Sequence, residues 1–343
     1  MSTSNLDGYN LKSALVNGLI NEDVMQKIWD ISKIPLPLTD AIGTDSHKNE
    51  YYEWTQDSLA APAIDNKVID GDDIDQDDTN LGVRVGNHSQ TSVKEVKVST
   101  RAIESDTIGR ANELSYQVMM RQQELKRDLE ASMLSNNASI TGTDAVAGQA
   151  GGLNAWLETN VAEPATPGTI GGFNTGTGIV DAYVAGTAEA LTETKIRDVA
   201  EQVYIEGGNP TMFMAVPGVI RKFSEYLFSS SARIATLTAE TGQSESAATA
   251  KGSVNVFVTD FGVTLDLIPN RLQQNTATDV STAFLIDPQH LRQSFLHGFR
   301  TEPLAKTGLS DKRLMSTDWT FVVTTEKAHG MIPDIDNTAA VTA

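Results

Sequence analysis

Histidines are the side chains best able to bind a metal or transfer protons, and the chain has five of them: His47, His88, His290, His297 and His329. No two have the three- or four-residue spacing that sets two imidazoles on one helix face. His290 and His297 are seven residues apart, but Gly298, Phe295 and Phe299 indicate that any helix starting at His290 has ended by then. We therefore expect no metal site, and ordinary hydrogen bonds for each histidine.

An acidic segment offers a second possible cation site. Asp73, Asp75 and Asp77 have the alternating spacing of a calcium-binding loop. However, the sixth position of that loop is Asp78 instead of glycine, and the twelfth is Arg84 instead of glutamate. Seven aspartates fall between Asp65 and Asp78, and because like charges repel we expect a solvated loop there.

Glycine and serine motifs are incomplete. The GTGIV segment holds Gly176 and Gly178 but lacks the third glycine and the lysine of a phosphate-binding loop. The GQSES segment from Gly242 to Ser246 lacks the second glycine of a nucleophile elbow. The absence of cysteine excludes disulfides, zinc–thiolate sites, iron–sulfur clusters and thiol nucleophiles. We assign no catalytic, cofactor-binding or metal-binding residue, and expect that the protein is not an enzyme.

The charge and hydropathy of the chain disfavour two further classes of protein, nucleic-acid readers and membrane-spanning proteins. The chain has 343 residues and a formal net charge of −19, so it repels phosphate backbones and is not expected to read nucleic acid, although it could enclose it. Residues 1–20 lack the pattern of a secretory signal, and no apolar run is long enough to cross a membrane.

The first hundred residues predict extended segments with little core. Val24, Ile28 and Ile31 predict one short amphipathic helix, which Pro35 and Pro37 should follow with an extended path. Alternating apolar residues at 81, 83 and 85 predict a strand, Gly86-Asn87 a turn, and the β-branched residues 91–100 a second strand. Such a thin β-excursion over residues 50–101 needs a surface to lie on, in this chain or in a neighbouring copy.

A long helix is predicted from Ser105, with Ser105 or Asp106 as the cap, to about Asn136. It would be a rod of about 45 Å, with Lys126 and Glu130 paired on its solvent side.

The remaining chain predicts α+β architecture. We expect helices at 153–157, 193–205 and 217–228. Strands are expected at 211–216, 254–258, 263–267 and 284–286, with a long strand pair at 312–331. Residues 137–192 and 229–252 predict loops.

This order of elements, and several segments, resemble the major capsid proteins of tailed bacteriophages that have the Hong Kong-phage capsid fold. The similar segments are ELSYQ from Glu113, ELKRDLE from Glu124, PTMFMAVPGVIRKFSEYL from Pro210, DFGV from Asp260, LAKTGLSDKR from Leu304 and TTEKAHGMI from Thr324. The resemblance covers most of residues 100–333; the first hundred residues match in layout only.

The resemblance implies an N-terminal arm at 1–48, an extended β-hairpin loop at 49–101 and a peripheral domain with the long spine helix at 102–140 and 292–334. An axial domain would span 141–291, and a C-terminal tail 335–343. It implies a major capsid protein that self-assembles as pentamers and hexamers into an icosahedral head around double-stranded DNA. It also implies that the protein is part of the virion and is assembled in the cytoplasm of the host bacterium.

Expected partners are copies of the chain, a portal protein and possible scaffolding or decoration proteins. Because the arm begins almost at once, we expect a separate scaffolding protein or none. Three alternatives remain: a tail-tube or decoration protein, a hydrolase whose carboxylates meet only in the fold, and a monomer whose excursion folds back on its own body.

Overall fold

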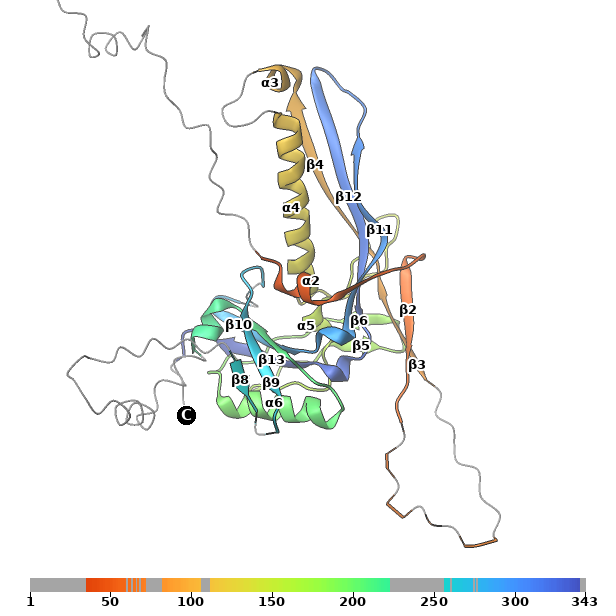
Figure 1. Cartoon of the computed structure of the whole chain (residues 1–343), viewed down its shortest axis with the longest axis vertical. Coiled ribbons are helices and arrows are strands. Elements are labelled where there is room, and N and C mark those ends of the chain that lie inside the picture. The colour runs from red at the N-terminus through yellow and green to blue at the C-terminus, as the bar shows by residue number, and fades with distance from the viewer. Residues whose placement is uncertain are drawn as a thin grey trace, which may run out of the picture.

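Two sheets and one long helix organise the part of the chain that the structure describes (Figure 1). This computed structural model describes residues 35–71 apart from 60, 63, 66 and 68, and residues 82–105, 112–222 and 256–339, the last apart from 260, 274 and 276. The predicted helix at 24–31, the aspartates at 72–78 and the GQSES segment lie outside these residues, as does the second half of the helix predicted to follow Pro217.

The upper lobe is built on a four-stranded sheet in the order β1-β11-β12-β4. Its strands are β1 (Gly43–Ser46), β11 (Leu291–Pro303), β12 (Ser310–Val323) and β4 (Gln90–Ser99). β1 runs parallel to β11, and the other neighbours are antiparallel. Alternate residues of β4, Val96 and Val98, are buried against the long helix α4 (Glu113–Met133), which covers this face.

Helix α4 begins later than the sequence predicts. Ser105 instead ends the short helix α3 (Thr100–Glu104), and the Asn112 side chain caps α4 by accepting a hydrogen bond from the Ser115 backbone N–H at 3.0 Å. The predicted start was wrong because the helical spacing of apolar residues was extended back to Ser105, although Asn112 is a residue type that caps helices equally well. With 21 residues α4 is about 32 Å long, not 45 Å.

The lower lobe contains a five-stranded sheet in the order β13-β10-β7-β9-β8. Its strands are β13 (Gly330–Asp336), β10 (Val280–Ile286), β7 (Met212–Ala215), β9 (Thr264–Pro269) and β8 (Val256–Val258). β7 and β9 are parallel and the other pairs antiparallel. The predicted strands at 211–216, 263–267 and 284–286 are confirmed to within four residues at their ends, and so is the described part, 256–258, of the strand predicted at 254–258.

This sheet separates two apolar cores. Met214 and Phe284 point to the core that also holds Leu125 and Leu129 of α4, whereas Phe213 and Leu285 point to the core under helix α6 (Glu193–Ile205). Because both faces are buried, β7 and β10 are apolar at nearly every position.

Smaller elements join the lobes. They are α2 (Pro37–Ala41), α5 (Leu153–Trp156), the hairpin of β5 (Gly172–Asn174) and β6 (Ile179–Asp181), and the 3₁₀ turns η2 (Pro288–His290) and η3 (Glu326–Ala328). The helices predicted at 153–157 and 193–205 are confirmed. Pro37 does not extend the chain as predicted; it occupies the first turn of α2, where its missing N–H is not needed.

The predicted excursion divides into two parts. β2 (Tyr51–Gln56) pairs with β3 (Val83–His88) as a hairpin, and the described part of the intervening loop extends away from the body (Figure 1). β4, in contrast, pairs with β12 along its whole length. The prediction that residues 50–101 form one thin projection was therefore wrong for β4, because Val96 and Val98 are buried in the core that also holds Leu125 and Leu129 of α4.

Two more predictions were wrong. Gly86 and Asn87 form no turn but lie inside β3, where the Asn87 side chain is fully buried. The predicted strand pair at 312–331 consists of β12 and β13, which belong to different sheets because η3 turns the chain between them.

Candidate functional site

The structure does not gather the five histidines. Their hydrogen-bond partners are Ser89 and Ser294 for His47, Thr141 for His88, Thr324 for His290, the Gly298 carbonyl for His297 and the Asp287 N–H for His329. Within the described ranges, no three histidine, aspartate or glutamate side chains form a group that could hold a metal ion. The same ranges contain no helix long and apolar enough to span a membrane.

His329 is the most perturbed of the five. Its side chain is fully buried, and burial lowers its pKa to about 3. The neutral ring accepts the Asp287 N–H at Nδ1 over 3.2 Å, and Asn160 donates to the His329 carbonyl at 3.0 Å. This arrangement ties the start of β13 to the end of β10 and has no opening to a substrate.

The GTGIV glycines form a turn. Gly176 and Gly178 lie between β5 and β6, and Gly178 has a φ of 71°, which a residue with a side chain rarely adopts. The Tyr51 hydroxyl donates to the Gly178 carbonyl at 2.9 Å. The glycines therefore serve a contact with the β2–β3 hairpin.

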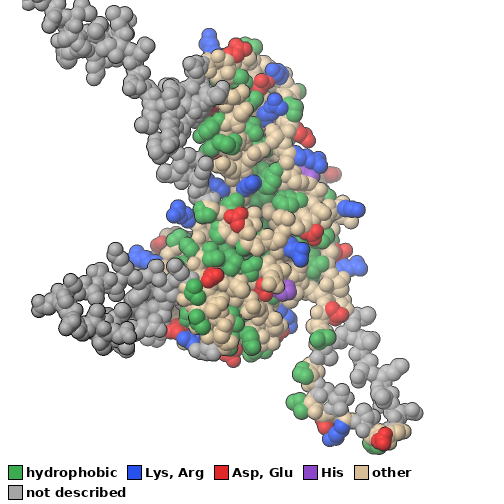
Figure 2. All heavy atoms as spheres, in the orientation of Figure 1, with side chains coloured by type: hydrophobic (Ala, Val, Ile, Leu, Met, Phe, Trp, Pro, Cys, Tyr) green, Lys and Arg blue, Asp and Glu red, His purple; other side chains and the backbone are tan. Residues whose placement is uncertain are grey.

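The hairpin loop carries the most exposed apolar side chains. Leu59, Ile64 and Ile69 are exposed by 98%, 102% and 75%, and Figure 2 shows apolar atoms standing out on this projection at the lower right. Three large aliphatic side chains held away from the body leave apolar surface in water that a partner could cover.

The base of the hairpin is fixed to the body. Asn87 donates to the Phe321 carbonyl at 2.8 Å and accepts the Gly151 N–H at 2.9 Å. Trp54 packs against Trp156 with ring centroids 5.6 Å apart. The loop thus projects from a well-anchored pair of strands.

Two histidines lie at this base. His47 precedes β2 and bonds to Ser294 at 2.9 Å and to Ser89 at 2.8 Å. His88 ends β3, and its ring lies tilted against that of Tyr51, with ring centroids 4.7 Å apart. Burial lowers the pKa of both, although Asp318 and Asp45 act in the opposite direction on His47 and Glu50 does so on His88.

A buried carboxylate joins three segments near the lower end of α4. Glu130 is fully buried and accepts hydrogen bonds from the Leu38 N–H at 2.9 Å, the Thr39 N–H at 2.8 Å, the Thr39 hydroxyl and the Asn270 side chain at 2.8 Å. The predicted solvent-side pair of Lys126 and Glu130 was therefore wrong. The first turn of α2 supplies donors that no pairing rule within α4 could reveal.

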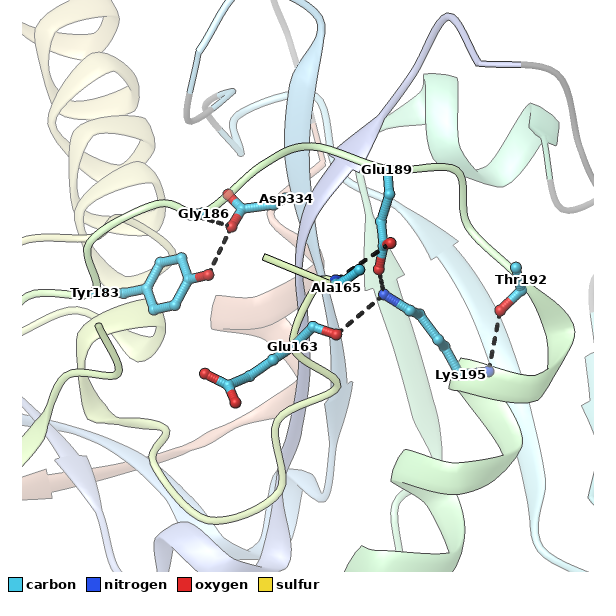
Figure 3. A network of polar contacts seen from close by, with 8 residues as sticks. All are labelled: Glu163, Ala165, Tyr183, Gly186, Glu189, Thr192, Lys195 and Asp334. Atoms are coloured by element: carbon cyan, nitrogen blue, oxygen red, sulfur yellow. Dashed lines mark hydrogen bonds and ion pairs between the residues drawn. The ribbon is translucent and has the colours of Figure 1, made fainter. Parts of the chain in front are cut away.

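A second polar network fastens the loops around β13 (Figure 3). The buried Asp334, with a φ of 53°, accepts from the Tyr183 hydroxyl at 2.6 Å and from the Gly186 N–H at 2.7 Å. Burial and then the hydrogen bond to Asp334 raise the pKa of Tyr183. Nearby, Lys195 of α6 contacts Glu189 and donates to the Glu163 carbonyl at 3.2 Å.

Burial lowers the pKa of Lys195, and the charge of Asp334 opposes that shift.

The outer edge of the five-stranded sheet is covered. Residues 161 and 189 form β-bridges to β13, which is the edge strand. Sequence reasoning missed both Glu130 and Asp334, because their partners lie 91 or more residues away and no local spacing marks them.

The described geometry thus holds anchored projections and buried structural networks. A family model for the SU10 major capsid protein matches residues 3–336. The chain belongs to this family. It is therefore a phage major capsid protein, as its resemblance implied.

Solved structures agree with this assignment at the level of the fold. The capsid of a native GTA particle is similar with a TM-score of 0.60 and 12% identity, over 95% of this chain and 99% of that one. The SrpI encapsulin of Synechococcus elongatus PCC 7942 is similar with a TM-score of 0.56 and 13% identity, over 99% of both chains. A chain of Mycobacterium phage Cain is similar with a TM-score of 0.57 and 12% identity, over 95% of this chain and 99% of that one. The Hong Kong-phage-like capsid fold is confirmed.

Among characterised sequences, the major capsid protein of Escherichia phage Phieco32 is 30% identical over 132 residues. The match covers 38% of this capsid protein and only 35% of that relative. It therefore adds support for the family, while shell geometry and partners need separate arguments.

Proposed function

We propose that the protein self-assembles as pentamers and hexamers into the icosahedral head of a phage, around packaged double-stranded DNA. The observation that carries this proposal is the projecting hairpin loop with Leu59, Ile64 and Ile69 in water. A neighbouring subunit that covers them would gain roughly 1.5–3 kcal/mol for each side chain fully buried. Because a closed shell repeats such a heterologous contact around every subunit, modest pairwise contacts suffice.

The proposed division of the chain keeps the arm at 1–48, the axial domain at 141–291 and the tail at 335–343. The extended loop at 49–101 has its projecting part between β2 and β3. The pairing of β4 with β12 supports counting residues 90–99 with the peripheral domain at 102–140 and 292–334, whose spine helix is α4. The pairing of β13 with β10 likewise supports counting residues 330–334 with the axial domain.

We further propose that the protein turns over no substrate. Its proposed partners are many copies of itself, a portal protein, and scaffolding or decoration proteins. A net charge of −19 would keep packaged DNA from adhering to the shell. Assembly would take place in the cytoplasm of the host bacterium.

Negative-stain microscopy of the purified protein tests the proposal. Closed shells of uniform diameter are expected. Tubes would indicate a tail component, and small particles at all concentrations would contradict self-assembly.

Deletion of the projecting loop tests the role of the hairpin. Residues 60–81 are replaced by two glycines, which leaves Val83 and Arg84 paired with Gln56 and Thr55 in the hairpin. We expect a folded, soluble subunit that forms no shells. Shells at normal yield would contradict the assigned role of the loop.

A further inference from the structure

One face of α4 borders an open groove in the upper lobe. The groove has a volume of about 330 Å³ and is lined by Met119, Gln122, Gln123 and Lys126 of α4 and by Phe299 of β11. Met119 and Phe299 are exposed by 45% and 39%. The Lys126 ammonium lies 5.8 Å from the centre of the Phe299 ring, so the groove has an apolar floor and one positive charge at its side.

The groove lies on the same helix face as Glu130. At 3.6 residues per turn, Met119, Gln123, Lys126 and Glu130 form one stripe along α4. At its lower end Glu130 binds the Leu38 and Thr39 N–H groups at 2.9 and 2.8 Å. The described chain therefore starts at Pro35, beside the end of the groove, and 34 residues precede it.

These preceding residues contain a segment that matches the groove. Val24, Ile28 and Ile31 recur at helical spacing after Asn21, a residue type that caps helices. From Val24 to Ile31 such a helix rises about 10 Å, the same as from Met119 to Lys126 on α4. Asp23 and Asp30 in the segment have charge opposite to Lys126.

We propose that residues 21–32 dock as an amphipathic helix in the α4–β11 groove of the same chain. Val24, Ile28 and Ile31 then cover Met119 and Phe299, and the arm helix runs parallel to α4 toward Glu130. The short connection favours the same chain over a second copy. The four Cα-to-Cα steps from Ser32 to Leu36 span up to about 14 Å, whereas Lys126 lies about 6 Å along α4 from Glu130. Such a tether gives a local concentration of roughly millimolar.

The absence of native cysteine makes cross-linking a direct test. The full-length subunit carries Ile28→Cys together with Gln123→Cys and is treated with a short bismaleimide at low protein concentration, before any assembly. The matched control carries Ile28→Cys together with Val258→Cys, at an exposed position of β8 in the lower sheet. We expect an intramolecular product with monomer mass, formed at least about tenfold faster for the first pair than for the control.

Equal rates for the two pairs would overturn the proposal. Covalent dimers as the main product would also overturn it, because the groove would then hold the arm of a second copy. This readout needs no shell, so it is independent of whether the proposed assembly function holds.

Limited trypsin digestion provides a second readout that needs no engineered cysteine. Lys27 and Lys33 lie in or beside the docked segment and should be protected in the wild-type subunit. Ile28→Asp and Phe299→Ser should each speed cleavage there by about tenfold, since docking and cleavage exclude each other. Leu6→Asp, outside the segment, is the control. Wild-type rates in both groove variants would contradict docking.

Discussion

At the scale of single residues, the side chain with the largest structural effect is the fully buried carboxylate of Glu130. Glu130 exchanges its hydration for four donors on α2 and Asn270, and both of these distant segments must be in place beside α4 to supply them. Removing a buried charge from water costs several kcal/mol unless such donors replace it. Glu130 therefore specifies how α2, the spine helix and the segment that follows β9 fit together, more than it adds net stability.

Glu130→Gln tests this interpretation. The amide keeps one acceptor oxygen but turns an NH₂ group toward N–H donors, so we expect a loss of about 2–4 kcal/mol in the free energy of unfolding. Urea unfolding of the unassembled subunit measures it. Glu124→Gln is the control on the same helix, because the Glu124 pair with Arg121 is partly exposed, and it should change stability by about 0.5 kcal/mol or less. An equal loss of stability in the two variants would contradict this role of Glu130.

His329 makes stability depend on pH. Its folded pKa, about 3, lies below the unfolded value near 6.5, so the unfolded chain takes up a proton first as pH falls. The contribution of the neutral ring is complete above about pH 6.5 and declines by about 1.4 kcal/mol per pH unit below it.

His329→Asn should remove this pH dependence, since the amide oxygen can still accept the Asp287 N–H without titrating. The difference in unfolding free energy between wild type and variant should shift by more than about 1 kcal/mol, in favour of the variant, between pH 7 and pH 5.5. Chemical denaturation at the two values checks it. A constant difference would show that His329 takes up protons equally in the folded and unfolded states, and would contradict the lowered pKa.

At the scale of elements, α4 joins the two lobes through the core that they share. Leu125, Leu129 and Met133 are buried in the core shared by the two lobes, and the face beside them borders the groove. The remaining exposed face carries charged side chains such as Asp128, which pairs with Lys94 of β4 at 2.6 Å. One helix can serve three surroundings because its 3.6-residue period separates the faces.

Leu125→Asp or Leu129→Asp should remove this support. Each places an unpaired charge in the core, so we expect a loss of several kcal/mol and insoluble protein. Ser115→Asp is the control, because its side chain is exposed near the N-terminus of the same helix and a negative charge there is favourable. The soluble fraction after expression measures the outcome. Soluble, assembling core variants would show that the stripe is not buried.

At the scale of the whole molecule, a well-packed body carries a projecting hairpin loop. The hairpin base is bound to the body by Asn87 and by the Trp54–Trp156 contact, while the loop beyond it presents apolar side chains to water. A rigid base is useful to such a projection, because it lowers the entropy that must be lost when the loop docks.

Replacing Leu59, Ile64 and Ile69 together by serine should leave the subunit folded but reduce the yield of shells by more than about tenfold. The three side chains are exposed in the subunit, so the folded state loses little, whereas each buried contact in the shell loses roughly 1.5–3 kcal/mol. Size-exclusion chromatography and microscopy measure the yield. Lys67→Ser on the same loop is the control, and an equal yield from both variants would contradict an apolar docking role.

Much of the secondary structure was predictable from the sequence. Residues 193–205 combine helical spacing with a Thr192 cap, and the apolar run at 211–216 is dense enough to indicate a buried strand. Boundaries were less predictable where two caps competed, as with Ser105 and Asn112 ahead of α4. Gly86-Asn87 misled for a related reason: turn propensity is local, whereas the Asn87 amide is held by partners 64 and 234 residues away.

The sequence by itself determined the α+β class, the spine helix, the absence of thiol chemistry and the resemblance to capsid proteins. These follow from periodicity, composition and short segments, which are properties of neighbouring residues. Only the tertiary structure decided that β4 joins β12, that Glu130 is buried and that the projection is limited to the loop between β2 and β3. Those outcomes depend on which distant segments supply hydrogen bonds and apolar cover, and that choice is made by the packed chain as a whole.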